Sequence, residues 1–115
     1  MPDYYADSSV LVKRHVFEPG TNWFQQLADP ASGNTILTAQ ISIVEVISAL
    51  QRRVREGVLT QVDAQRLGGD IRALGQHEYQ LIAVTLAIIE RACQLLERHP
   101  LRAYDAIQLR CCPNC

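Results

Sequence analysis

Asp7 is the first residue of this chain whose type and setting could do chemistry. It follows the short β-prone run Tyr4-Tyr5-Ala6 and precedes the two hydroxyl residues Ser8 and Ser9. Open α/β folds place their chemistry at the carboxyl end of a strand, where a helix begins. The plainer alternative is that Asp7 or Ser8 only caps the helix that follows.

Glu45 is the second candidate, because it lies inside the apolar run SIVEVISAL. A charge at a buried position costs several kcal/mol unless it is compensated. Ser42, Ser48 and Ala49 are small neighbours, which leaves room for another chain segment or an ion. The alternative is that Glu45 faces solvent, opposite the apolar stripe of residues 43–50.

Asp105 is the third acid, in the first turn of the last expected helix. It could simply complement the positive end of the helix dipole, which is worth about 0.3–1 kcal/mol. The three acids are stronger evidence for a functional site together than each is alone. Two helix starts and one buried helical face can converge at the carboxyl ends of neighbouring strands.

Three converging carboxylates point to metal chemistry. Without a cation they would repel one another and raise at least one pKa. A hard divalent ion such as Mg²⁺ takes oxygen ligands, activates a water and neutralises charge on a phosphodiester. Basic residues would then have to hold the phosphates, and Arg14, Arg52 and Arg53 are the candidates. Alternatively, Arg52 and Arg53 are an ordinary solvated helix end.

Composition limits the class of protein. The 115 residues fit one domain, and 48% hydrophobic with 20% charged residues is ordinary for a globular protein. A net charge of −1 does not favour a protein that coats nucleic acid. Lys13 is the only lysine, and this arginine bias mildly favours phosphate partners, although GC-rich coding sequence explains it equally well. No apolar run is long enough to span a membrane and no signal peptide precedes Asp7, so we expect a cytoplasmic protein.

The cysteines do not form a disulfide framework. Cys93 stands alone, whereas Cys111, Cys112 and Cys115 crowd the last residues, so residues 111–115 form an atypical Cys-rich tail. Cys112 and Cys115 have the spacing of half a zinc site. No second pair accompanies them, and we disfavour zinc.

The elements that must position the acids alternate between strands and helices. Strands are expected at residues 3–7, 35–39 and 79–84. Each is followed by two helices, which begin near Asp7, Thr21, Ser42, Thr60, Thr85 and Leu101. Gly68-Gly69 within the fourth helix indicates a kink or close packing. This order predicts a parallel sheet with helices on both faces.

Three blocks of the sequence together resemble a known family. ADSSVLVKRHVFEPGTNWF, TAQISIVEVISAL and LRAYDAIQL resemble the PIN domain, and within it the VapC-type toxins of bacterial type II toxin–antitoxin pairs. The resemblance runs from Tyr4 to about Leu109, which places a PIN-like domain at residues 1–110. It implies an α/β fold of three layers, α/β/α, with a short parallel sheet.

The resemblance also implies a function and a ligand set. It implies a metal-dependent endoribonuclease with Asp7, Glu45 and Asp105 as ligands for Mg²⁺ or Mn²⁺. Ser9 matches the hydroxyl residue beside the first acid and would support it from outside the ligand set. The implied partners are the RNA substrate, a second copy in a homodimer, and a small antitoxin that blocks the site.

The sequence departs from the family pattern after LRAYDAIQL. Members usually add a strand with a further acid and a closing helix, whereas this chain continues with Arg110-Cys111-Cys112-Pro113-Asn114-Cys115. We therefore expect a truncated copy that lacks the last strand and helix and leaves the Tyr4–Asp7 strand with an unpaired edge.

Two alternatives to an active nuclease remain open at this point. One is an impaired PIN domain that only binds its antitoxin or a second copy of itself. A remote one is an aspartyl phosphatase or phosphotransferase with Asp7 as nucleophile. Such enzymes commonly need a second acid two positions on, where this chain has Ser9.

Overall fold

The sheet has three parallel strands with β2 in the middle. The computed structural model describes residues 3–16 and 19–113. Tyr5 pairs with Leu37 across the first strand pair, and Thr38 pairs with Leu81 across the second. The order is β1-β2-β3, and in the described part of the chain β1 has no strand on its outer side, as expected. The strands are β1 (Asp3–Tyr5), β2 (Thr35–Ala39) and β3 (Gln80–Ile82).

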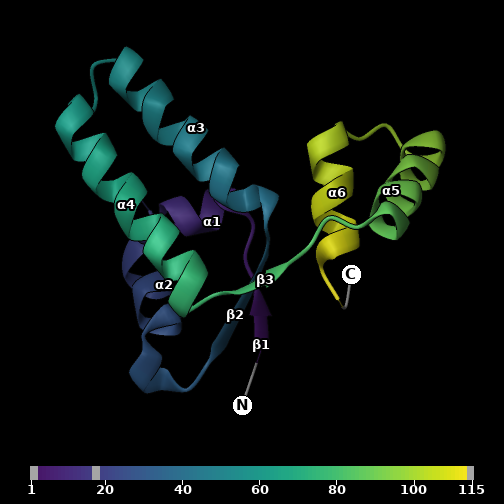
Figure 1. Cartoon of the computed structure of the whole chain (residues 1–115), viewed down its shortest axis with the longest axis horizontal. Coiled ribbons are helices and arrows are strands. Elements are labelled where there is room, and N and C mark those ends of the chain that lie inside the picture. The colour runs from purple at the N-terminus through teal and green to yellow at the C-terminus, as the bar shows by residue number, and fades with distance from the viewer. Residues whose placement is uncertain (1–2, 17–18, 114–115) are drawn as a thin grey trace.

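Helices cover both faces of this sheet (Figure 1). Helices α1 to α4 lie on one side, and α5 and α6 lie on the other. The predicted three-layer α/β/α architecture is therefore confirmed. The helices are α1 (Ser8–Val12), α2 (Thr21–Ala28), the 3-10 turn η1 (Pro30–Ser32), α3 (Ile41–Arg55), α4 (Gln61–His77), α5 (Leu86–Arg98) and α6 (Ala103–Cys111). None of the described helices is both long and apolar enough to cross a membrane.

Local capping explains where several helices begin. The Asp7 carboxylate accepts a hydrogen bond from the Val10 amide, at 3.1 Å, at the start of α1. At the start of α4 the Thr60 hydroxyl accepts a hydrogen bond from the Asp63 amide, and at the start of α5 the Thr85 hydroxyl accepts one from the Ile88 amide. A short oxygen side chain satisfies an amide that the first turn leaves free, which is why these starts were predictable.

The ends of several elements differ from the expectation. β1 stops at Tyr5, because Asp7 has turned to cap α1, and β3 is also shorter than expected. The last helix begins at Ala103 rather than Leu101 and extends two residues beyond Leu109. Cys111, expected in the tail, is thus a buried helical residue. Cys115, and with it the zinc half-site, lies outside the described residues.

The apolar core fills the space between the sheet and helices α1 to α4. Its largest fully buried side chains include Leu11, Phe24, Leu50 and Ile71. In contrast, the buried apolar side chains of α5 and α6 are small: Ala92, Ala106 and Cys111. The radius of gyration is 14.8 Å, against about 13 Å for a compact chain of this length. One side of the sheet is thus packed more thickly than the other.

Glycine allows α4 to approach α3 closely. A Cβ atom built on Gly68 would lie 3.2 Å from the Ile47 Cδ1 atom, and one built on Gly75 would lie 3.2 Å from the Ile43 Cδ1 atom. A Cβ on Gly69 would meet nothing within 4 Å. The close packing predicted for the Gly68-Gly69 pair is therefore confirmed at Gly68, while Gly69 faces open space.

These two neighbouring glycines give a matched stability test. We expect Gly69→Ala to raise the free energy of unfolding by about 0.5–1 kcal/mol, because alanine favours the helix and nothing obstructs it. Gly68→Ala should lose that gain to overpacking against Ile47. Urea denaturation of both variants measures the difference. Equal stabilisation by the two substitutions would contradict the close helix contact.

Candidate functional site

Asp7 is held at the end of β1 by contacts on both sides of it. The fully buried Thr38 hydroxyl donates to the Ala6 carbonyl, at 2.6 Å, so the chain just before Asp7 is tied to β2. The Asp7 Oδ1 atom accepts from the Ser9 hydroxyl at 2.7 Å and from the Val10 amide at 3.1 Å. The Asp7 side chain is nevertheless exposed. It is thus both a helix cap and an accessible carboxylate at a strand end.

Glu45 is positioned by the start of α3. The Gln40 amide donates to the Ile82 carbonyl at 2.9 Å, which extends the β2–β3 pairing to the point where α3 begins. Glu45 lies in the second turn and is half-buried. Residues four apart lie on one face of a helix, so Glu45, Ala49 and Arg53 form one row. The small Ala49 leaves space between the acid and the base.

A pocket lies between α1 and α3, and we call it the α1–α3 pocket. Its volume is about 340 Å³. It combines one carboxylate with three basic side chains and two hydroxyls. Its lining residues are Ser8, Ser9, Val12, Lys13, Glu45, Ala49, Arg52 and Arg53.

The basic side chains of the α1–α3 pocket differ in their surroundings. Arg52 is exposed, whereas Arg53 is half-buried and its Nη1 atom donates to the Ala49 carbonyl at 3.4 Å. Lys13 Nζ donates to the Pro19 carbonyl at 3.0 Å. The pocket can therefore offer positive charge within reach of a carboxylate, an arrangement that suits a phosphate group next to a cation.

The structure brings some of the predicted site residues to one pocket. Glu45, Ser9, Arg52 and Arg53 share the α1–α3 pocket, and Asp7 joins it through its hydrogen bond to Ser9. Asp105 is exposed on α6, in the opposite layer, and does not line the pocket. Among the described residues, no three His, Cys, Asp or Glu side chains form a group that could hold a metal ion.

Arg14 belongs to the opposite end of the sheet. Its guanidinium forms an ion pair with Glu78 at 3.0 Å, donates to the Tyr79 hydroxyl at 3.1 Å and lies 5.8 Å from the centre of that ring. Its side chain is only 16% exposed. These contacts hold the turn before β3 against the end of α1. The structure therefore does not bring Arg14 together with the acids.

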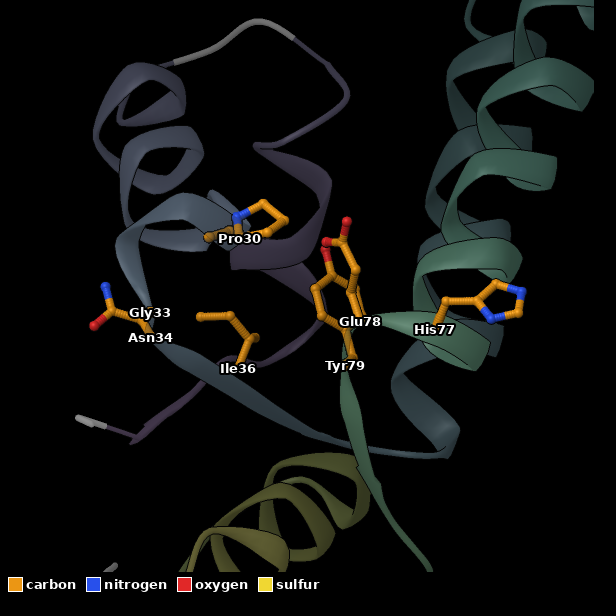
Figure 2. Close-up of a pocket in the computed structure, with 8 residues that line it drawn as sticks. Pro30, Gly33, Asn34, Ile36, His77, Glu78 and Tyr79 are labelled. Atoms are coloured by element: carbon orange, nitrogen blue, oxygen red, sulfur yellow. The ribbon is translucent and has the colours of Figure 1, made fainter.

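A second pocket, of about 280 Å³, lies near the amino ends of β2 and β3. Figure 2 shows Pro30, Gly33 and Asn34 on one side of it and Glu78 and Tyr79 on the other. Its one carboxylate, that of Glu78, is already paired with Arg14. This pocket is therefore a weaker candidate for chemistry than the α1–α3 pocket.

The donor set at the strand ends suits a hard divalent cation. Asp7 and Glu45 offer carboxylate oxygens, which a hard divalent cation prefers as ligands. Both hydrogen bonds to Asp7 among the described residues fall on Oδ1. Mg²⁺ keeps several waters and is commonly held by one or two carboxylates plus substrate phosphates. The absence of a three-acid cluster is thus compatible with such an ion.

Sequence reasoning missed part of this site. Lys13 lines the pocket, and its four-residue spacing from Ser9 could have placed it there. It also missed Gln108, which is buried in α6 with hydrogen bonds to α3 and β1. A single polar residue between Ile107 and Leu109 was the available signal.

Comparison with solved structures identifies the fold. VapC20 of Mycobacterium tuberculosis, described as a sarcin-ricin loop cleaving toxin, superposes with a TM-score of 0.72. The match covers 94% of this chain and 78% of that one, at 18% sequence identity. This chain has the fold of a VapC-type PIN domain. No protein-family model and no curated protein matches the sequence.

His15 provides a test of this PIN fold away from the acids. Burial lowers its pKa, the Arg14 charge lowers it further, and Asp70 opposes them. Its Nε2 atom is buried without a partner among the described residues. The unfolded chain therefore binds a proton at His15 more readily than the folded chain does. As a result, the free energy of unfolding falls as the pH drops from about 6.5, the unfolded pKa, through the lower folded pKa.

We expect His15→Asn to flatten this part of the pH dependence. The free energy of unfolding, measured in urea between pH 7.5 and pH 5, should fall less in the variant than in the wild type. His99→Asn is the matched control, because His99 is exposed. An unchanged pH slope in His15→Asn would show that His15 is not buried as a neutral group.

Proposed function

We propose that this chain is a VapC-type endoribonuclease that cleaves RNA with the help of Mg²⁺ or Mn²⁺. The observation that carries the proposal is the α1–α3 pocket, which joins Glu45 to the hydroxyl that holds Asp7. The site lies at the carboxyl ends of parallel strands, where α/β folds bind ligands. The likeness to VapC20, a toxin described as cleaving the sarcin-ricin loop, supports RNA as the substrate class.

In this proposal Asp7, Glu45 and Asp105 provide the carboxylates that hold the ion. The bound ion would supply activation of a water and neutralisation of phosphodiester charge. Ser9 fixes the Asp7 carboxylate by its hydrogen bond, so that the second oxygen keeps a defined direction. Glu45 is half-buried beside Ala49, which limits its freedom to turn away from the pocket.

Arg52, Arg53 and Lys13 hold the RNA phosphates in this proposal. They line the same pocket as Glu45 and offset its charge. Guanidinium groups grip phosphate through two parallel hydrogen bonds, which suits a substrate that must lie beside an acidic site. We assign Arg14 a structural role instead, because it is already paired with Glu78.

The proposed partners and location follow the VapC resemblance. A small antitoxin that blocks the site, a second copy in a homodimer and a cytoplasmic location are all part of this proposal. RNA is the proposed substrate.

A second candidate function is favoured by two observations. No three acids cluster among the described residues, and α5 exposes 84% of Leu86 and 43% of Ile89. A PIN fold that binds an antitoxin or a second copy without cutting RNA would have these properties. Exposed apolar side chains on one helix are typical of a protein-binding surface.

Asp7→Asn tests the nuclease proposal. We expect RNA cleavage in Mg²⁺ or Mn²⁺ to fall by at least about a hundredfold, because even residues outside the ligand set cost 10–100-fold. Asparagine still caps a helix, so the metal-free stability should change little. In the wild type, Mn²⁺ at about a hundred times its dissociation constant should add about 2.7 kcal/mol to the free energy of unfolding. The variant should lose this gain.

Asp29→Asn is the matched control for that experiment. Asp29 also caps a short helical turn, by accepting from the Ala31 amide at 2.9 Å, but it does not line the α1–α3 pocket. It should retain full cleavage and full stabilisation by Mn²⁺. Cleavage that survives Asp7→Asn sinks the nuclease assignment. A wild type that binds an antitoxin but neither binds Mn²⁺ nor cleaves RNA favours the second candidate.

Arg52→Gln tests the phosphate contacts. In the non-cleaving Asp7→Asn background, we expect RNA binding to weaken and the slope of log K against log salt to shrink by about 0.7, the loss of one phosphate contact. Fluorescence anisotropy over a salt series measures both. Arg55→Gln is the control, because Arg55 is exposed at the same helix end but does not line the pocket. Equal losses in the two variants would indicate general charge attraction instead of a site.

A further inference from the structure

Gln108 is the centre of a hydrogen-bond network that joins three elements of the fold. It is 7% exposed on α6. The Tyr5 hydroxyl of β1 donates to its Oε1 atom. Its Nε2 atom donates to the Ser42 hydroxyl of α3 at 2.8 Å and to the Tyr104 hydroxyl of α6 at 2.5 Å. One amide thus contacts β1, α3 and its own helix at once.

Each partner of Gln108 lies close in the chain to one of the three acids. Tyr5 is two residues before Asp7, and Ser42 is three residues before Glu45. On α6, Tyr104 adjoins Asp105, and Gln108 follows Asp105 by three residues. Three helical residues span roughly 4.5 Å along the axis, so Glu45 and Asp105 each lie within one helical turn of a network residue. The three acid-bearing elements therefore meet through a single side chain.

The three hydroxyls of the network suit an amide partner. Ser42 is fully buried, and a buried hydroxyl without a partner is costly. The Tyr5 hydroxyl donates to the amide oxygen of Gln108, and the Ser42 and Tyr104 hydroxyls accept from its amide nitrogen. An amide supplies both an acceptor and two donors, which no apolar residue can do.

The network matters because the main apolar core does not include α6, which packs chiefly against α5. The other buried residues of this helix are Ala106 and Cys111, both small. None of the residues in the main apolar core cluster comes from α5 or α6. A change at Gln108 would consequently shift α6, and with it Asp105, relative to Asp7 and Glu45.

We propose that Gln108 is a positioning residue that sets the spacing of Asp7, Glu45 and Asp105 for metal binding. This inference rests on the proposed nuclease function. Gln108 does not touch substrate or metal in this scheme. It acts through the elements that carry the three carboxylates.

Gln108→Met tests the proposal, because methionine keeps the length of the side chain and removes all three hydrogen bonds. We expect the dissociation constant for Mn²⁺, measured by electron paramagnetic resonance of the free ion, to rise by about 10–100-fold. Cleavage of RNA should show a lower kcat with a nearly unchanged KM, since the phosphate-binding arginines stay in place. Gln94→Met is the matched control, because Gln94 is exposed on α5, and it should match the wild type.

A purely structural role gives a different result. If Gln108→Met lowers the metal-free melting temperature but leaves the Mn²⁺ dissociation constant and kcat within twofold of the wild type, the positioning role is overturned. If Gln108→Met does not fold, Tyr104→Phe and Ser42→Ala each remove one hydroxyl from the network. Each should weaken Mn²⁺ binding several-fold, and unchanged binding in both overturns the proposal.

The same measurements separate this inference from the proposed function. A wild type that neither binds Mn²⁺ nor cleaves RNA overturns both. Normal wild-type binding, lost in Asp7→Asn but kept in Gln108→Met, overturns only the positioning role of Gln108.

Discussion

The parallel pairing of β1 with β2 is the constraint on which the candidate site depends. Because both strands run in the same direction, the end of β1 and the start of α3 emerge at the same edge of the sheet. The fully buried Thr38 hydroxyl donates to the carbonyl of Ala6, the residue that follows β1. Asp7 and Glu45 are thereby brought to adjacent elements, although 38 residues separate them in the sequence. Everything that the α1–α3 pocket can do follows from this register.

Local chemistry explains which parts of the fold could be predicted from the sequence. Thr60 and Thr85 cap helices because the amide three residues later needs a hydrogen-bond acceptor. The donor and the acceptor of each bond are close in the sequence, so the bond can be predicted from it. The β-branched run TILTA likewise marks β2 at residues 35–39, as predicted. Asp7 was recognisable as a candidate because a helix-capping residue and a functional carboxylate are both expected where a strand ends and a helix begins. These features depend on neighbours in the sequence.

The remaining features depend on partners distant in the sequence. Arg14 was a reasonable candidate for phosphate binding until the fold placed Glu78 and Tyr79 beside it. Gln108 looks like one polar residue on an amphipathic helix, and only the tertiary structure brings Tyr5 to it. The position of Asp105 relative to the α1–α3 pocket also depends on how α6 packs. No pattern within LRAYDAIQL specifies that position.

The two faces of the sheet are held by different forces, and this bears on how the site is kept in shape. Helices α1 to α4 share an apolar core with side chains as large as Phe24 and Leu50, and such a core resists displacement over its whole area. Helix α6 has only small fully buried apolar residues, and besides its packing against α5 it is joined to α3 and β1 by hydrogen bonds of Gln108 to Ser42 and Tyr5. A hydrogen bond weakens steeply with misalignment, whereas apolar contact is not directional. The connection of α6 to the strands and helices that carry Asp7 and Glu45 therefore depends more on the geometry of a few polar atoms than the packing of α1 to α4 does.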